Sequence, residues 1–172
     1  ENLLIGPIRH DEPILASKEV LFYGQAIAAI LAESHDQAKK AALLVTAEIE
    51  ELESIVSIDQ AMKSKSFLDD PIIVSTGNSQ KAIKDAKNSL TGSLSIGGQE
   101  HYYLEGQVAM SIPTESNEML VHSSTQNPTE VQHLVAHVLS VPQNAIEVVT
   151  RRMGGGFGGK ETDSSQLACV CA

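Results

Sequence analysis

The chain of 172 residues has very few aromatic side chains and no tryptophan. Only 3% of its residues are aromatic, whereas 42% are hydrophobic in total, so its core must be built from aliphatic side chains. This hydrophobic content excludes a wholly disordered chain. A chain of this length makes one domain or two small ones.

Basic side chains are also scarce. Twelve Lys and Arg stand against 22 Asp and Glu, which gives a formal net charge of -10. Binding to duplex nucleic acid needs clustered basic groups, so we expect no nucleic-acid partner. No apolar run approaches the roughly 20 residues that a membrane span needs, so we expect no membrane partner. The two cysteines, Cys169 and Cys171, predict no disulfide framework and indicate a cytoplasmic protein.

Both ends of the sequence predict a segment of a longer protein. The chain opens at Glu1 without an initiator methionine or a signal sequence. Residues 164–172 have the pattern of an apolar helix too short to be stable alone. A mature protein with frayed ends is the alternative. Apolar surface exposed on such a segment would favour self-association.

The first 60 residues predict two strands, a helix and a further strand. Ser34 followed by Gln37 is a capping box, which predicts a helix over residues 35–44. Short apolar or alternating runs predict strands. These runs lie at residues 20–23 and 45–50, and residues 26–32 fit either a strand or a helix. The polar stretch 54–88 is predicted to be a connector.

The remaining residues predict a hairpin and one strong helix. Asn127 at the N-cap and Pro128 in the first turn precede apolar residues spaced i, i+3, i+4 and i+7. The overall class is α+β. Strands are expected at residues 89–97, 108–112, 119–121 and 146–150, with a turn at 113–117.

A glycine-rich loop follows the last predicted strand. Residues 154–159 contain five of the twelve glycines. Glycine permits positive φ angles and lets backbone N–H groups approach a ligand closely, and the N-terminus of the next helix adds partial positive charge. The loop therefore predicts a cradle for an anion or an oxo group. Phe157, a bulky side chain among glycines, argues against a simple linker.

Two nucleotide-binding motifs fit this loop only formally. Gly154, Gly156 and Gly159 have dinucleotide-fingerprint spacing, which also needs a βαβ unit and an acidic residue about 20 positions further on. A P-loop fits up to Glu161, where a carboxylate replaces the Mg²⁺-binding hydroxyl and would repel phosphates. A nucleotide-binding module, a turn without a ligand and an inert interaction domain remain alternatives.

Several motifs together resemble the molybdenum hydroxylases, the family of the xanthine dehydrogenases and aldehyde oxidases. Residues 152–161, RMGGGFGGKE, are similar to the glycine loop of that family, and residues 97–105, GGQEHYYLE, to its other cofactor-side motif. Residues 124–128, STQNP, resemble the segment before the helix. Residues 22–25, FYGQ, resemble the hammerhead domain that precedes the molybdenum domain. The resemblance is weakest over residues 54–88.

The resemblance implies an α+β fold in three parts. Residues 1–60 would be the C-terminal part of an α/β hammerhead domain, and residues 61–88 a connector. Residues 89–172 would be the N-terminal part of a truncated molybdopterin-binding domain.

The resemblance also implies roles for four residues. In this family a molybdenum–molybdopterin centre hydroxylates a carbon with water. Gln99 would hydrogen-bond near the oxo group of the molybdenum, while Phe157 and Gly158 would lie against the cofactor; no protein atom is expected to ligate the metal. The purine-oxidising branch carries a substrate-binding carboxylate at the position of Glu161, where aldehyde-oxidising relatives generally carry an apolar residue. Glu161 would therefore bind hypoxanthine or xanthine, the purines that the complete enzyme converts to urate in purine catabolism.

Simpler explanations exist for the same residues. Gln99 fits a polar strand end, Phe157 a plug in the core, and Glu161 a carboxylate at a helix N-terminus. Lys160 is expected to have a structural role. An aldehyde or other heterocycle hydroxylase is the alternative activity.

The family resemblance implies further components. Iron–sulfur clusters of the [2Fe-2S] type and FAD would lie in other domains or in an iron–sulfur/FAD small subunit, and the general base would lie further along the polypeptide. We therefore expect the 172-residue segment to be inactive alone and to hold no cofactor.

Other clusters predict no separate site. His133 and His137 have the i, i+4 spacing of a zinc pair but lack a third ligand. Arg151 and Arg152 fit either a contact to a cofactor phosphate or a solvated strand end. The spacing of the two cysteines favours buried apolar roles.

Overall fold

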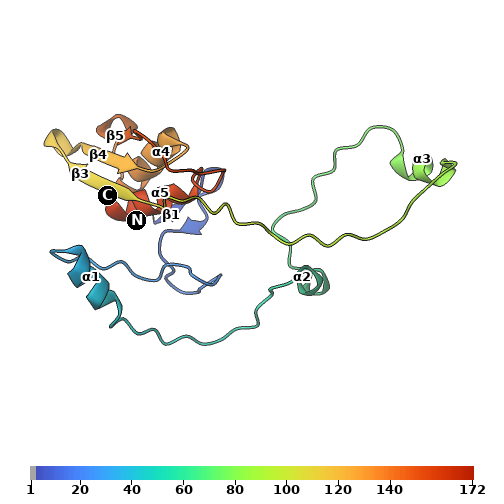
Figure 1. Cartoon of the computed structure of the whole chain (residues 1–172), viewed down its shortest axis with the longest axis horizontal. Helices are drawn as coiled ribbons and strands as arrows, with labels where there is room; N and C mark the ends of the chain where they lie inside the picture. The colour runs from blue at the N-terminus through green and yellow to red at the C-terminus, as the bar shows by residue number, and fades with distance from the viewer. Residues whose placement is uncertain (1–2) are drawn as a thin grey trace. The chain divides into compact units, whose positions relative to one another are not determined.

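A computed structural model describes residues 3–172, and the chain divides into two units (Figure 1). One unit contains residues 1–44 and 98–172, and the other contains residues 45–97. The fold mixes helices and strands, as the sequence predicts. No helix in the described part of the chain is long and apolar enough to span a membrane.

A three-stranded sheet forms the framework of the first unit. Its order is β3 (Ala109–Pro113), β4 (Met119–Ser123) and β5 (Ile146–Val149). Strands β3 and β4 are antiparallel and joined through η1 (Glu115–Asn117), which confirms the predicted hairpin. Strands β4 and β5 are parallel, because α4 (Pro128–Leu139) and η2 (Gln143–Ala145) connect them.

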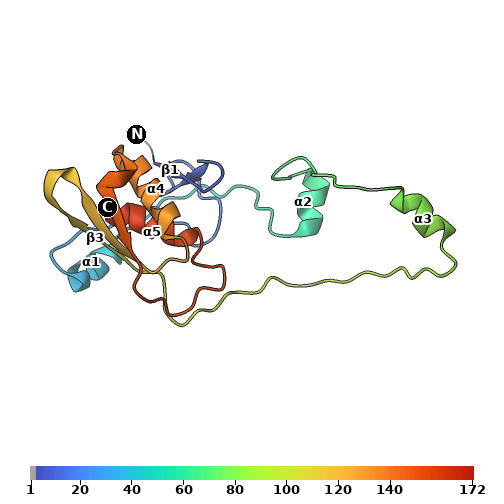
Figure 2. The ribbon, with the colours of Figure 1, turned by 90° about the horizontal axis from the view of Figure 1, so that it is seen from above.

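Helices α4 and α5 (Asp163–Cys171) pack on this sheet (Figures 1 and 2). Val121 in the central strand pairs with Ser111 in β3 and Val148 in β5, and it is fully buried. Residues next to Val121 and its partners in the strands point to the opposite face of the sheet, away from the helices. Met110, which pairs with His122 on that face, is 53% exposed. The core is aliphatic, and its most buried members are Val121, Val131, Leu134, Val135, Ala136, Ile146 and Ala168.

The N-terminal segment contributes to the same core. Strands β1 (Leu4–Ile5) and β2 (Glu12–Pro13) form a short antiparallel pair. Ile5 and Ile14 are buried in the core. The side-chain amide of Gln166 in α5 donates to the carbonyl of Ile14 at 2.7 Å. Residues 152 positions apart in sequence are thus held together.

The predicted N-caps are confirmed in two helices. Ser34 Oγ accepts from the N–H of Gln37 at 3.3 Å, and α1 spans His35–Ala42. Asn127 Oδ1 accepts from the N–H of Glu130 at 3.1 Å at the start of α4. The local hydrogen-bonding capacity of these side chains explains why the sequence marks both helix starts correctly.

The second unit contains two short helices that the sequence pattern did not predict. Helices α2 (Ile58–Ser64) and α3 (Ser79–Asp85) lie in the stretch predicted to be a polar connector. Ser57 accepts from the N–H of Gln60 at 3.3 Å, which is the same capping pattern as at Ser34. Neither helix has a buried residue, so local capping rather than a packed apolar face marks them.

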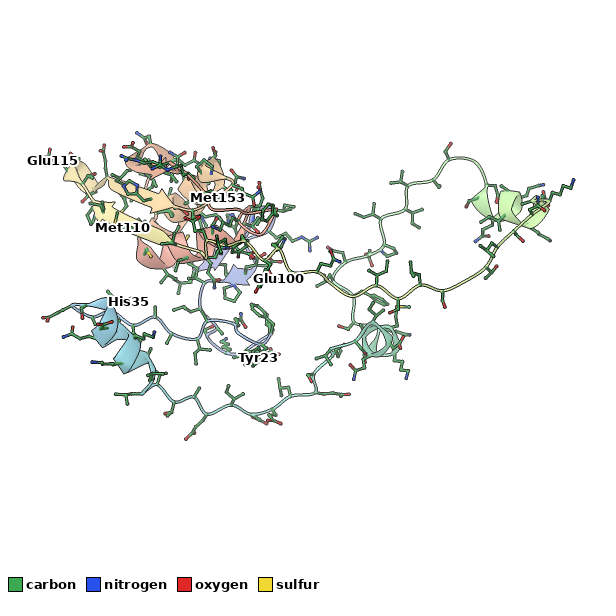
Figure 3. All side chains as sticks on the ribbon, in the orientation of Figure 1. Tyr23, His35, Glu100, Met110, Glu115 and Met153 are labelled. Carbon is green, nitrogen blue, oxygen red and sulfur yellow. The ribbon has the colours of Figure 1, made fainter. Side chains whose placement is uncertain are left out.

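Four predicted elements are absent from the structure. Residues 20–23, 45–50 and 89–97 form no strand within the described part of the chain, and residues 26–32 form neither a strand nor a helix. Tyr23 is fully exposed (Figure 3), and Leu90 and Leu94 are 98% and 84% exposed. A strand needs a hydrogen-bonded neighbour and a surface that covers its apolar face. Alternation of apolar and polar residues predicts a strand correctly only where a neighbouring strand and a covering surface are both present, as they are for β3, β4 and β5.

Candidate functional site

The glycine-rich loop leaves β5 and ends before α5. Its backbone enters the left-handed region at Gly155 (φ 97°), Phe157 (φ 54°) and Gly158 (φ 102°). Two internal hydrogen bonds stabilise the turn: Gly159 N–H donates to Gly156 O at 2.8 Å, and Glu161 N–H donates to Gly158 O at 3.2 Å. Glycine adopts positive φ without steric cost, whereas Phe157 does so only because its surroundings fix the loop.

Lys160 is fully buried behind the loop. Its Nζ lies 2.9 Å from Glu105 Oε2 and 2.8 Å from Ser124 Oγ. It also lies 4.9 Å from the centroid of the Tyr103 ring. A buried ammonium group needs such partners, because burial without them is strongly unfavourable.

Glu105 collects three donors at one carboxylate oxygen. Oε2 accepts hydrogen bonds from Lys160 Nζ, Ser124 Oγ and the N–H of Gly154 at 2.8 Å. The hydrogen bond from Lys160, followed by those from Ser124 and Gly154, lowers the pKa of Glu105 to about 2. Glu105 is therefore ionised at neutral pH and forms an ion pair with Lys160.

Gln126 holds the end of the loop. Its side-chain Oε1 accepts from the N–H groups of Gly158 at 2.9 Å and Lys160 at 3.2 Å. Its own N–H donates to Lys160 O at 2.8 Å. A Cβ at Gly156 would collide with the Gln126 side chain, so the loop and this amide are closely fitted.

Segment 101–107 packs against the other side of the loop. Gln107 Nε2 donates to Gly159 O at 2.9 Å and to Tyr103 Oη at 3.0 Å. A Cβ at Gly159 would lie 2.6 Å from Tyr103 Cε1 and 2.8 Å from His101 Nδ1. Two motifs that are 50 residues apart in sequence therefore form one structure.

Three of the four predicted site residues, Phe157, Gly158 and Glu161, are exposed residues in the loop or directly after it. The fourth, Gln99, lies in another segment. Phe157 is 76% exposed, so it is not a plug in the core of this chain. Gly158 and Glu161 are exposed, and Glu161 Oε1 accepts from Asn127 Nδ2 at 3.3 Å. Gln99 is exposed and makes no hydrogen bond within residues 3–172, so its motif reaches the loop through His101 and Tyr103.

The residues that hold the loop in place do not follow from the sequence pattern alone. Glu105 and Gln126 lie in motifs quoted for their resemblance, but no contact was predicted for either. Lys160 has the structural role expected of it. The signal that could have found the ion pair is a lysine inside a glycine loop, because a cation there needs a counter-charge elsewhere in the chain.

The free backbone donors of the loop fit an anionic or oxo-bearing ligand. The N–H groups of Gly155, Gly156 and Phe157 make no hydrogen bond within residues 3–172. Consecutive N–H groups in a glycine-rich turn are suited to phosphate or oxo oxygens. Because Gln126 and segment 101–107 fill the back of the loop, a ligand is expected on the side of Phe157.

Other ligand types fit less well. Helix α5 begins at Asp163, beyond the last glycine, so the loop does not open a helix as a dinucleotide fingerprint does. No group of three His, Cys, Asp or Glu residues in the described part of the chain could hold a metal ion. His133 is exposed, and the ring of His137 lies 4.4 Å from that of His10.

The two cysteines differ in their surroundings. Cys169 is 6% exposed, and burial raises the pKa of its thiol to about 12. Cys171 is exposed and its Sγ lies 3.6 Å from the carbonyl oxygen of Ala109. The expectation of burial therefore fits Cys169 and is wrong for Cys171.

The two parts of the chain match different protein families. Residues 1–53 match the a/b hammerhead domain of aldehyde oxidase and xanthine dehydrogenase. Residues 64–172 match the molybdopterin cofactor-binding domain.

Curated relatives and solved structures agree with these matches. Xanthine dehydrogenase of Dictyostelium discoideum is 43% identical over 167 residues, covering 97% of this chain and 12% of that protein. Nicotinate hydroxylase hnxS of Emericella nidulans is 41% identical over 172 residues, covering 97% of this chain and 13% of that protein. The structure of quinoline 2-oxidoreductase from Pseudomonas putida 86 shares the fold, with a TM-score of 0.78, 24% identity, and coverage of 93% of this chain and 22% of that one.

A second solved structure has the same fold. Aldehyde oxidoreductase from Desulfovibrio gigas superposes with a TM-score of 0.77 and 24% identity, over 94% of this chain and 19% of that one. The chain thus spans about an eighth of the length of the curated relatives described above.

Proposed function

The chain belongs to the molybdopterin cofactor-binding domain family, and we propose that it is part of the catalytic subunit of a xanthine dehydrogenase that oxidises hypoxanthine and xanthine to urate. The observation that carries the proposal is the glycine loop. It combines two free backbone donors with an exposed carboxylate, Glu161, only four residues beyond Phe157.

The loop would hold the molybdenum–molybdopterin group through its backbone. The N–H groups of Gly155 and Phe157 are the donors available to oxygen atoms of the group, whereas the unbonded N–H of Gly156 belongs to a buried residue. Phe157 offers an exposed ring for apolar contact, and Gly158 has no side chain to block close approach. When bound, the group supplies the two-electron oxidation that accompanies hydroxylation of a carbon by water. Gln99 would add an uncharged amide donor.

Glu161 would bind and orient the purine. An exposed carboxylate accepts hydrogen bonds from ring N–H groups, and such charge-assisted bonds are strong when water is excluded. The side-chain amide of Asn127 donates to Glu161 Oε1 and so limits the orientations of the carboxylate.

The whole protein would contain more than this chain. We assign residues 1–60 to a hammerhead domain, 61–88 to a connector and 89–172 to the start of the molybdopterin-binding domain. A [2Fe-2S]/FAD subunit or further domains would receive the electrons, and the whole protein would act in the cytoplasm in purine catabolism.

The 172-residue chain by itself is expected to be inactive and free of cofactor. The loop alone offers few contacts to a large pterin, and these would form one side of a complete site. Metal analysis of the purified chain tests this point: background molybdenum is expected, and one molybdenum per chain would contradict it.

The experiment that tests the activity uses the full-length protein with its partner subunit and cofactor. Urate formation from xanthine is measured beside oxidation of an aldehyde and of nicotinate, with molybdenum content determined in parallel. Xanthine turnover is expected. A molybdenum-loaded enzyme that forms no urate would refute the proposal.

A second candidate is hydroxylation of another nitrogen heterocycle. The nicotinate hydroxylase relative is nearly as similar to this chain as the xanthine dehydrogenase relative. The same substrate comparison separates the two candidates, because nicotinate would then be turned over faster than xanthine. Preferred oxidation of the aldehyde would instead support an aldehyde hydroxylase.

A further inference from the structure

We propose that the Lys160–Glu105 ion pair is a positioning device that closes the glycine loop into a ring and thereby sets the places of Phe157, Gly158 and Glu161. The inference deepens the proposed function, on which it rests for the identity of the ligand.

A single carboxylate oxygen joins the two ends of the loop. Glu105 Oε2 accepts from the N–H of Gly154, the first glycine, and from the side chain of Lys160, six residues later. Ser124 Oγ donates to the same oxygen and lies 2.8 Å from Lys160 Nζ. The residues between Gly154 and Lys160 are therefore held at both ends by one group.

The main chain of Lys160 is fixed as firmly as its side chain. Its N–H donates to Gln126 Oε1 and its carbonyl accepts from the N–H of Gln126 at 2.8 Å. The hydroxyls of Thr125 and Ser164 each lie 3.2 Å from the same carbonyl. Lys160 is thus the residue through which segment 124–126, α5 and the loop are connected.

This arrangement accounts for the strained residue at the apex. Phe157 has a φ of 54°, a conformation that a bulky side chain adopts only when its surroundings determine it. Its exposed ring gains little from packing in this chain. The hydrogen bond from Gly159 N–H to Gly156 O closes the turn that contains Phe157, and the ion pair helps to fix the residues on both sides of that turn.

The ion pair also connects the two motifs. Glu105 belongs to segment 97–105 and Lys160 to the loop, so breaking the pair weakens the connection between the two motifs, while the hydrogen bonds from Glu105 N–H to Gly154 O and from Gln107 Nε2 to Gly159 O remain. The titratable side chains that contact the Lys160 ammonium group are Glu105 and Tyr103, both from that segment. Among the described residues, only Glu105 forms an ion pair with Lys160.

The test combines two single variants and their double variant in the full-length protein. Glu105→Gln keeps an acceptor but leaves the Lys160 ammonium buried without a counter-charge. Lys160→Met leaves the carboxylate without its main donor, and the double variant removes both charges. Asp85→Asn is the matched control, because it breaks the exposed ion pair between Lys81 and Asp85 in α3.

The first measurement is amide hydrogen exchange over residues 154–161 in the cofactor-free protein, a readout that requires no substrate. Each single variant should raise exchange at least 10-fold at the hydrogen-bonded loop amides, those of Gly154 and residues 158–161, while the amides of α4 stay protected. The double variant should exchange less than Glu105→Gln, because it removes the uncompensated buried charge. Asp85→Asn should leave the loop unchanged.

The second measurement is the molybdenum content of the same proteins after cofactor loading. The single variants should retain several-fold less molybdenum than the wild type and the Asp85→Asn control. Wild-type exchange in the loop of both single variants would overturn the inference, even if xanthine is the substrate. If the fold-increase in exchange rate of the double variant equals the product of the fold-increases of the two single variants, the two charges act independently, and this result would also overturn the inference. A failure to oxidise xanthine, with the exchange results as expected, would refute the proposed activity and leave the positioning role intact.

Discussion

Asn127 connects the start of a helix to the candidate substrate-binding carboxylate. Its Oδ1 accepts from the N–H of Glu130 at 3.1 Å and caps α4, while its Nδ2 donates to Glu161 Oε1 at 3.3 Å. One side chain therefore uses both ends of its amide, one for stability and one for orientation. These two effects can be separated by substitution.

Replacing Asn127 with Ala should cost about 1 kcal/mol of stability, because the N-cap is lost. Asn127→Ser should keep the cap and lose only the donor to Glu161. In the full-length enzyme the serine variant should show roughly a 2- to 10-fold lower kcat/KM for xanthine with almost unchanged stability. Urea unfolding and steady-state kinetics give the two values. Equal kcat/KM values for Asn127→Ser and the wild type would show that the contact to Glu161 does not affect substrate binding or turnover.

Gly159→Ala should disturb the packing of the loop on segment 101–107. The added Cβ would lie 2.6 Å from Tyr103 Cε1, and overpacking of this kind costs about 1–3 kcal/mol. Gly98→Ala is the control, because no atom lies within 4 Å of a Cβ there. The melting temperature, measured by thermal unfolding, should be lowered only for Gly159→Ala. A normal melting temperature for that variant would mean that the two motifs are less closely packed than described.

Leu134→Ala should destabilise the first unit by about 2–5 kcal/mol, because the side chain lies in the aliphatic core and is 2% exposed. Leu43→Ala removes the same atoms from a side chain that is 81% exposed and should change stability by less than about 0.5 kcal/mol. Urea denaturation of the chain measures both. Similar losses for the two variants would contradict the assignment of the core to α4.

The loop should lose stability in acid. The folded-state pKa of Glu105 is about 2, below the ordinary value of 4.5, so its ionised form stabilises the folded chain. That contribution is complete above about pH 4.5 and is lost as the pH falls through about 2. Between pH 5 and pH 8 the ion pair should contribute no pH dependence. Comparison of urea unfolding for the wild type and the Glu105→Gln/Lys160→Met double variant, which carries neither charge, checks this: the difference should be constant between pH 5 and pH 8 and change in acid, and a constant difference down to pH 2 would contradict it.

The sequence predicts helices and strands correctly where local and tertiary signals agree. Asn127 and Ser34 mark helix starts because their side chains satisfy nearby N–H groups without help from distant residues. The strands of the sheet are predicted because apolar residues alternate and a helix covers them. Residues 89–97 have the same alternation but no neighbouring strand, and a pattern in sequence cannot reveal that lack.

The site was predictable in part for the same reason. The glycine loop is continuous in sequence, so its conformational freedom and free donors follow from composition alone. The residues that hold it are distant: Glu105 lies 55 positions from Lys160, and Gln126 lies 34. Burial of Lys160 is the fact that joins them, and burial depends on the whole fold.

The central claim is that the glycine loop presents Glu161 to a purine at the cofactor. Glu161→Val in the full-length, molybdenum-loaded enzyme tests it most directly, with xanthine and an aldehyde compared as substrates. Loss of a charge-assisted hydrogen bond costs about 1.5–3 kcal/mol, so kcat/KM for xanthine should fall roughly 10- to 150-fold while aldehyde oxidation is retained. Unchanged kinetics with xanthine, at equal molybdenum content, would contradict the account.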